Sequence, residues 1–164
     1  MIQIPSDVEV EVKGNTVSVK GKKGALQKSF SGRGLRIEKK ENAIQVFGGD
    51  GGEMLERTIE SHLKNMFHGV TNGFTRKLQV VHSHFPINVE VKGREVLIKN
   101  FIGEKKPRIA RIVGDTKVEV KGSEIFVSGV DKEAVGQTCA NICSATCIRG
   151  KDSRVFQDGI YLVE

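Results

Sequence analysis

The 164-residue chain has no tryptophan, one tyrosine, three cysteines and three prolines, and it has no long apolar run. Its apolar runs are well below the roughly 18 residues that a membrane span needs, so we do not expect the chain to be a membrane protein. Three cysteines are too few for the cross-linked framework of a small secreted domain. Residues 1–5 lack the basic start and apolar middle of a secretory signal. We therefore expect a soluble intracellular protein.

Basic residues outnumber acidic ones by 26 to 20, and they gather in two stretches of the chain. Residues 20–40 hold eight lysines and arginines against one acid, and residues 92–111 hold seven against two. Segregated positive charge suits a polyanion, because each basic side chain that meets a phosphate releases counterions. One such stretch alone would more often be a solvated surface, but two at matching places favour nucleic-acid binding.

An internal repeat organises the chain. The string Val-Glu-Val-Lys-Gly occurs at residues 10–14, 89–93 and 118–122, and the first two copies belong to longer similar stretches offset by 79 residues. A period near 80 residues is too long for a solenoid unit. We predict two homologous domains that arose by internal duplication and that cover residues 1–83 and 84–164.

Within each copy, apolar residues first alternate and then recur every three or four positions. Val8, Val10 and Val12 alternate with charged residues, which indicates a half-buried strand, and Gly14 and Gly93 suit hairpin turns. The expected helical faces are Met54, Leu55, Ile59, Leu63, Met66, Phe67 and Val70, then Val135, Cys139, Ile142, Cys143 and Thr146. We predict an α+β fold in which each domain is a small antiparallel sheet packed on one helix.

Glycines mark the expected ends of both helices. The first helix is predicted to end near Gly69, and the second to run from an N-cap at Asp131 to Gly150. The three cysteines are spaced by four residues on that second helix, where they span about two turns, too far for one metal ion. Cysteine also packs as a small apolar residue, so we interpret all three as core residues.

Other candidate sites are weak. The glycine-rich segment 48–52 lacks the Gly-Lys-Ser/Thr ending of a phosphate-binding loop. His82 and His84 have no nearby cysteine or carboxylate to complete a metal site, and no nucleophile motif stands out. We predict no catalytic activity, no metal and no cofactor. A tandem protein-interaction module with incidental charge remains the main alternative to nucleic-acid binding, and an enzyme such as a hydrolase is a distant third.

The scarcity of aromatic residues bears on how a nucleic acid would be recognised. Modules that read single-stranded sequence stack bases on exposed aromatic side chains. This chain has no aromatic-rich strand of that kind. We therefore expect contacts to phosphate, sugar and shape, which favours a structured RNA as the partner.

Two long stretches carry a family resemblance. They are HFPINVEVKGREVLIKNFIGEKKPR at residues 84–108 and KDSRVFQDGIY at residues 151–161. Both closely resemble the ribosomal large-subunit protein six family in its archaeal form, whose eukaryotic counterpart is called protein nine. The likeness covers essentially the whole chain, and it includes the turn at residues 72–74. Ile109 is one departure, at a position where a further basic residue is expected.

The resemblance implies a non-catalytic protein of the ribosome in the cytoplasm. It implies binding to large-subunit rRNA beside the sarcin–ricin region, with neighbouring ribosomal proteins as partners and translational GTPases nearby, and no role for DNA or a membrane. Its C-terminal domain is expected to make the main rRNA contacts. Carried onto this chain, the contact residues are Arg94, Lys99, Lys105, Lys106, Arg108, Arg111, Lys151, Arg154, Phe156 and Gln157. The Phe156 ring would either stack on a base or lie buried against the second helix.

Overall fold

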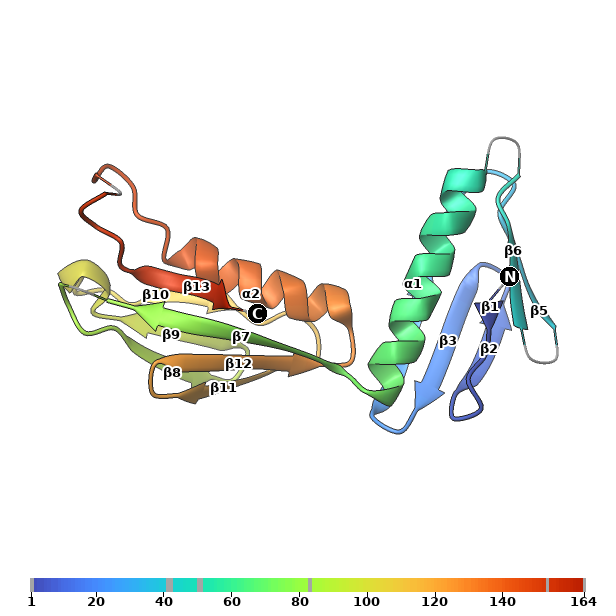
Figure 1. Ribbon diagram of the computed structural model, residues 1–164, viewed down its shortest axis with the longest axis horizontal. Helices are drawn as coiled ribbons and strands as arrows, with labels where there is room; N and C mark the ends of the chain where they lie inside the picture. Colours follow the sequence, from blue (N-terminus) through green and yellow to red (C-terminus); the bar gives the residue numbers. More distant parts are fainter. Residues whose placement is uncertain (1, 41–42, 50–51, 83, 153, 164) are drawn as a thin grey trace. The chain divides into compact units, whose positions relative to one another are not determined.

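The chain folds into two compact units of mixed α and β structure (Figure 1). The computed structural model describes residues 2–40, 43–49, 52–82, 84–152 and 154–163. The first unit comprises Met1–Gly73 with Val130–Lys132, and the second comprises Phe74–Gly129 with Glu133–Glu164. Within the described residues, neither helix is long and apolar enough to cross a membrane.

The first unit contains six strands and the helix α1 (Glu53–Thr71). Its strands are β1 (Ile2–Gln3), β2 (Glu9–Lys13), β3 (Thr16–Gly21), β4 (Gly24–Ser29), β5 (Arg36–Lys40) and β6 (Ala43–Phe47). They form two antiparallel three-stranded sheets of order β2–β3–β4 and β1–β6–β5, and α1 packs against strands of both. The basic stretch of this unit, residues 20–40, is therefore largely strand.

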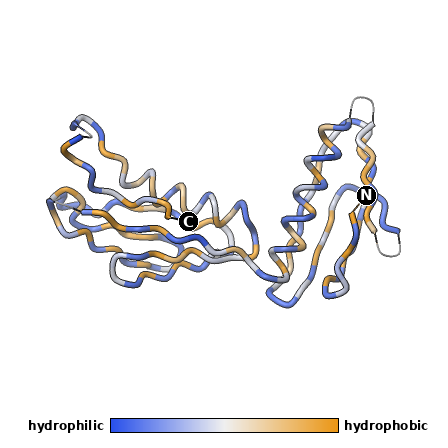
Figure 2. Tube along the Cα trace, viewed as in Figure 1, coloured by the Kyte–Doolittle hydropathy of each residue, from blue (hydrophilic) through white to orange (hydrophobic). Residues whose placement is uncertain are grey.

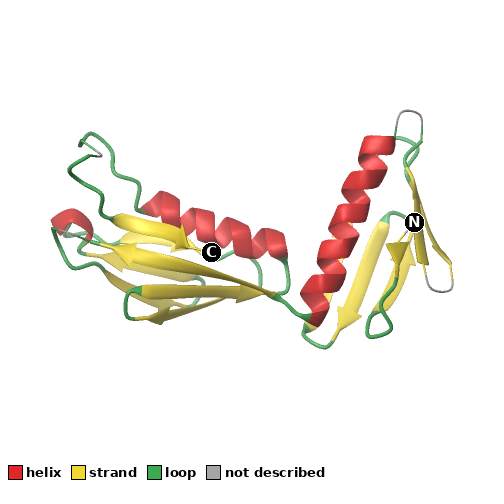
Figure 3. Cartoon of the chain, viewed as in Figure 1, coloured by secondary structure: helices red, strands yellow, loops and turns green. Residues whose placement is uncertain are grey.

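The second unit contains seven strands, the helix α2 (Lys132–Ala145) and a short 3₁₀ helix, η1 (Phe101–Gly103). Its strands are β7 (Phe74–Val81), β8 (Asn88–Lys92), β9 (Glu95–Lys99), β10 (Arg108–Arg111), β11 (Lys117–Lys121), β12 (Glu124–Gly129) and β13 (Gly159–Val163). The sheets have the orders β10–β9–β8 and β11–β12–β7–β13, again antiparallel. The helix and strand content in Figure 3 confirms the predicted α+β class.

The repeated Val-Glu-Val-Lys-Gly string is a hairpin in all three of its occurrences. Its first four residues lie in β2, β8 and β11, and each strand pairs with the one that follows it. The glycine then turns the chain, with φ of 62° at Gly14, 58° at Gly93 and 60° at Gly122. Glycine adopts this left-handed conformation without the steric cost that other residues incur, which explains why it recurs there.

The boundary between the units falls earlier than residues 83 and 84, where the sequence placed it. β7 belongs to the second unit because it pairs with β12 and β13. Ile2 of β1 pairs with Ile44, and Leu78 of β7 pairs with Ile125, which stands 81 residues after Ile44 in the repeat. β7 therefore occupies in the second unit the place that β1 has in the first, so the structural repeat begins at β7.

The helix ends also differ from the expected ones. α1 continues two residues past Gly69 to Thr71, and Gly73, with φ of 72°, donates its N–H to the carbonyls of His68 and Gly69. α2 ends at Ala145, five residues before Gly150. The carbonyls of Ala145 and Cys147, at this end and just beyond it, accept hydrogen bonds from Arg108.

Each unit has a hydrophobic core of its own, and apolar and polar residues alternate along the strands in Figure 2. Val17, Ile44 and Leu63 are fully buried in the first unit, and Phe101 is the largest fully buried side chain of the second. Met54 is 81% exposed, so its place on the core face of α1 was predicted wrongly. Leu55, the next residue, packs against the core while partly buried, and the fully buried residues of α1 begin at Ile59.

Candidate nucleic-acid interface

Three loops that are distant in the sequence meet at one end of the second unit (Figure 1). They are residues 84–87 before β8, residues 100–107 between β9 and β10, and residues 146–152 and 154–158 between α2 and β13. We call this surface the loop end. Asn100 links the first two loops, because its side-chain amide donates to the carbonyl of Pro86 at 3.0 Å. The loop end contains most of the residues that the sequence marked as RNA contacts.

Arg108 lies at the centre of the loop end, and its guanidinium is occupied within the protein. Nε and Nη2 donate to the two carboxylate oxygens of Glu104 at 2.9 and 2.6 Å. Nη1 donates to the carbonyls of Ala145 and Cys147 at 2.9 and 3.1 Å. These carbonyls stand at the end of α2 and just beyond it, so Arg108 satisfies acceptors that a helix end leaves free.

The Glu104–Arg108 pair is electrostatically favourable. The hydrogen bond from Arg108 lowers the pKa of Glu104, and Lys151 nearby lowers it further. The same hydrogen bond raises the pKa of Arg108. The guanidinium carbon also lies 4.4 Å from the centre of the buried Phe101 ring, a cation–π distance. Arg108 therefore joins the 100–107 loop to the core and to the C-terminus of α2.

Lys105 and Lys106 are exposed in the loop that Glu104 and Arg108 enclose. Among the described residues, neither ammonium group has an ion pair or a hydrogen-bond partner. Lys99, at the same end of β9, pairs with Glu90 at 2.7 Å, but both side chains are about half exposed. An exposed pair of this kind contributes little stability, so Lys99 can exchange its carboxylate for a phosphate at low cost.

Two of the sequence-predicted residues lie elsewhere. Arg94 is in the β8–β9 turn and Arg111 ends β10, and Ile112 donates its N–H to the carbonyl of Arg94 at 2.9 Å. Both therefore lie at the opposite end of the β9–β10 pair from the loop end, roughly 13 Å away for strands of this length. Ile109, the departure from the family pattern, is 54% exposed on β10 between the two ends.

The ring of Phe156 already has neighbours inside the protein. It stacks on the imidazole of His84, with ring centres 4.8 Å apart and an interplanar angle of 29°. The Nζ of Lys151 lies 4.5 Å from its centre. Phe156 thus organises the loop end through contacts with a histidine and a lysine, an arrangement that neither of the two roles expected from the sequence described.

His84 also holds the start of β13. Its Nδ1 lies 3.3 Å from Oδ1 of Asp158, and its backbone N–H donates to Oδ2 at 3.3 Å. The Asp158 side chain is fully buried. Arg154, which precedes Phe156 in the same loop, is exposed. Its backbone N–H donates to the carboxylate of Asp152, and its carbonyl accepts from the side-chain amide of Gln157. The turn presents Arg154 outward.

The cysteines do not all behave as core residues. Cys139 is buried and Cys143 is half-buried, and burial raises the pKa of both thiols. Cys147 is exposed because α2 has already ended, so the core interpretation was wrong for this residue. Across the described residues, no group of three or more histidine, cysteine or acidic side chains is placed to hold a metal ion.

The glycine-rich segment leads into α1 and shows no sign of a phosphate site in its described part. The N–H of Gly48 donates to Glu56 at 2.7 Å, and Glu53 and Glu56 place negative charge in the first helical turn. That charge already complements the positive end of the helix dipole and would repel an anion. Residues 50 and 51 lie outside the described residues.

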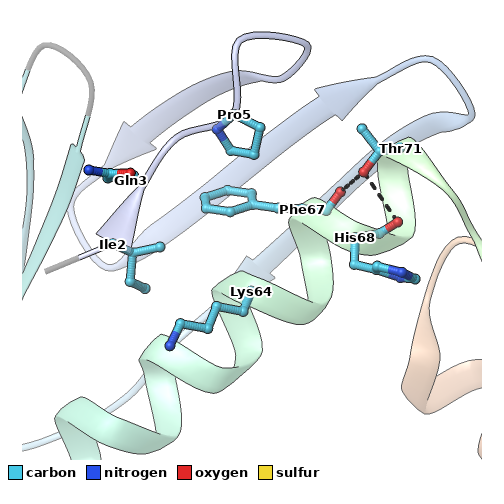
Figure 4. A pocket seen from close by; sticks show the side chains of 7 residues that line it. All are labelled: Ile2, Gln3, Pro5, Lys64, Phe67, His68 and Thr71. Atoms are coloured by element: carbon cyan, nitrogen blue, oxygen red, sulfur yellow. Dashed lines mark hydrogen bonds between the residues drawn. The ribbon is translucent and has the colours of Figure 1, made fainter.

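A shallow groove in the first unit lies between β1 and α1 (Figure 4). Ile2 and Phe67 form its apolar floor, and Lys64, His68 and Thr71 stand along the helix side. The Thr71 hydroxyl donates to carbonyls of its own helix. The hydroxyl of this groove is therefore engaged with the backbone of its own helix.

Sequence reasoning missed three residues that shape the loop end: Glu104, His84 and Asp158. Glu104 was counted only as an acid among basic residues, although its spacing of four from Arg108 was visible. Nothing in the sequence indicated that His84 and Asp158, which are 74 residues apart, are in contact.

The fold and this surface define a duplicated α+β protein with a basic, pre-built loop end. A model of the family described as ribosomal protein L6 matches residues 4–73 and 85–159, one match in each copy of the repeat. A protein of Methanothrix thermoacetophila named large ribosomal subunit protein uL6 is 48% identical, covering 99% of this chain and 94% of its own length. Proteins of the same name from Staphylothermus marinus and Methanosarcina mazei are 49% and 46% identical, each over 99% of this chain and over 92% and 94% of their own lengths.

The chain therefore belongs to the ribosomal protein L6 family, in its archaeal form. Members of this family are structural, non-enzymatic proteins of the ribosome. The family membership agrees with the resemblance noted in the sequence.

Proposed function

We propose that this protein is a structural constituent of the large ribosomal subunit in the cytoplasm, where it binds large-subunit rRNA through its second unit. The names of the relatives support the assignment to the large subunit. The observation that supports RNA binding is the loop end, where Lys105 and Lys106 project beside Lys99 and Lys151. We place this surface beside the sarcin–ricin region, with neighbouring ribosomal proteins around it and translational GTPases docking nearby.

The chemistry of the loop end suits the backbone of a folded RNA. Lysine is a compact charge that meets phosphate oxygens from many directions, and such contacts position the partner without reading its bases. Lys99, Lys105, Lys106, Lys151 and Arg154 would each neutralise a phosphate, and the Gln157 amide can donate to a sugar or phosphate oxygen. Arg94 and Arg111, at the other end of the strands, would contact a separate part of the backbone.

The test is a salt titration of binding to a large-subunit rRNA fragment that contains the sarcin–ricin region. We expect the logarithm of affinity to fall linearly with the logarithm of salt concentration. The double substitution Lys105→Ala and Lys106→Ala should weaken binding and reduce the slope by about two. A small-subunit rRNA fragment of equal length should bind much more weakly.

The matched control is Lys22→Ala with Lys23→Ala, the adjacent lysine pair of the first unit. Lys22 pairs with Asp7 at 2.6 Å, and Lys23 donates to the carbonyl of Asn72. These substitutions should leave the slope unchanged. Binding that does not depend on salt, or equal losses in both double variants, would contradict the assignment to the loop end.

A protein-interaction module would behave differently. Such a module should stay in the supernatant when ribosomes are sedimented from a lysate, whereas a ribosomal constituent sediments with the large subunit. The same experiment at rising salt reports how strongly charge contributes.

A further inference from the structure

Arg108 lacks the free donors that a phosphate-binding arginine needs. A guanidinium carries five N–H groups, and four of those of Arg108 are used on Glu104, Ala145 and Cys147. The side chain is 28% exposed, and its carbon rests on the Phe101 ring. A bidentate fork on a phosphate would require breaking the equally bidentate contact with Glu104.

The contacts of Arg108 close the loop that carries the two lysines. Glu104 precedes Lys105 and Lys106, and Arg108 follows Pro107, so the ion pair joins the two ends of a five-residue segment. Pro107 fixes one backbone angle within it. The bonds from Arg108 to the end of α2 then anchor this closed loop to the body of the unit.

We propose that Glu104 and Arg108 are positioning residues that hold Lys105 and Lys106 in the conformation that binds RNA, and that Arg108 is not itself a phosphate contact. The inference rests on the proposed function. Its physical basis is that a loop whose backbone is ordered before binding does not lose that backbone entropy when the RNA arrives. An unclosed loop would lose that entropy on binding.

For the removal of Glu104, the positioning role predicts a change in RNA affinity opposite in sign to the change that charge alone would cause. Removing an acid from a surface that binds a polyanion should strengthen binding, because it raises the positive charge. Glu104→Ala should instead weaken binding, because it opens the loop. Glu90→Ala is the matched control: Glu90 also pairs with a basic residue of the second unit, Lys99, but on an exposed strand surface.

We expect Glu104→Ala to weaken binding to the rRNA fragment about 2- to 10-fold, the cost of ordering the freed loop. Glu90→Ala should strengthen it by up to about 5-fold at low salt, as expected when an exposed ion pair is removed. Circular dichroism and thermal melting would confirm that both variants are folded. Tighter binding by Glu104→Ala would overturn the inference, as would equal changes in the two variants.

Limited trypsin digestion of the free protein tests the same loop without RNA. Trypsin can cut after Lys105, whereas the Lys106–Pro107 bond resists it, so one cleavage reports on the loop. Faster cleavage after Lys105 in Glu104→Ala than in the wild type or Glu90→Ala supports positioning, and equal rates contradict it. If the wild-type protein does not bind the fragment, the proposed function fails while digestion still decides the role of the pair.

Discussion

The two units use an adjacent pair of lysines in opposite ways. In the first unit, Lys22 and Lys23 are held by Asp7 and by the carbonyl of Asn72. In the second, Lys105 and Lys106 are exposed, and the nearby acid, Glu104, is taken by Arg108. The two lysines thus have partners within the protein in one copy of the repeat, whereas among the described residues they have none in the other.

The net charge of each unit depends on where the chain is divided. A division at residues 83 and 84 gives net charges of +4 and +2. The structural units give the reverse: the first carries 12 basic and 10 acidic residues, a net +2, and the second carries 14 and 10, a net +4. In the first unit, Lys39 donates to the carbonyl of Val10, and Lys22 and Lys23 are bound as described. The structural division gives the larger positive charge to the unit that we propose binds RNA.

The largest expected effect comes from truncating one buried side chain in the hydrophobic core of either unit. Leu63→Ala in the first unit and Ile98→Ala in the second each remove a fully buried side chain. Each should lower the free energy of unfolding by about 2–5 kcal/mol, measured by chemical denaturation. At temperatures where both variants are folded, only Ile98→Ala should weaken rRNA binding. An equal loss of binding in Leu63→Ala would place part of the interface in the first unit.

A smaller difference is expected between Gly48 and Gly129, which occupy matching positions of the repeat. A β-carbon on Gly48 would collide with the backbone of Gly52, whereas one on Gly129 would lie 2.9 Å from a methyl group of Val135. Backbone cannot move aside as a side chain can, so Gly48→Ala should lower the melting temperature more than Gly129→Ala. The reverse order would show that the turn before α1 can adjust more easily than the core beneath α2.

The smallest effect concerns the thiols, which only the second unit has. A thiol-reactive dye at pH 8 should label the exposed Cys147 quickly, while Cys139 and Cys143 react only as the unit opens. Burial raises the pKa of these two thiols above the unfolded value, so the stability they contribute is complete below that value and is lost as pH rises through the folded pKa. Cys147→Ser should change stability by less than about 0.5 kcal/mol. Rapid labelling of all three thiols in the folded protein would contradict their different burial.

Much of the fold could be predicted because its signals are local. Alternation along residues 8–12 and the glycines at 14 and 93 predicted the hairpins, which depend only on neighbouring residues. The α1 face from Ile59 to Val70 was predicted for the same reason. β7 was missed as the start of the second unit, because strand pairing is a contact between residues that are distant in the chain.

The candidate site was likewise predictable only in part. Its basic residues and Phe156 could be named from the sequence, and the repeat and the long motifs led to the family. The contacts of those side chains could not be named. The resemblance implies an RNA contact at Arg108, and only the fold shows that its side chain binds Glu104 and the end of α2.

The apolar periodicities and the repeat determined from sequence alone that this is a duplicated α+β protein, and the two basic stretches with few aromatic residues predicted a structured polyanion as its partner. These properties follow from composition and from periodicities of two to four residues. The tertiary structure alone decided which cations remain free, because that depends on partners such as Ala145 and Asp7 that lie 37 and 15 residues away from the basic residues they bind. A hydrogen bond across such distances leaves no trace in the local pattern of the sequence.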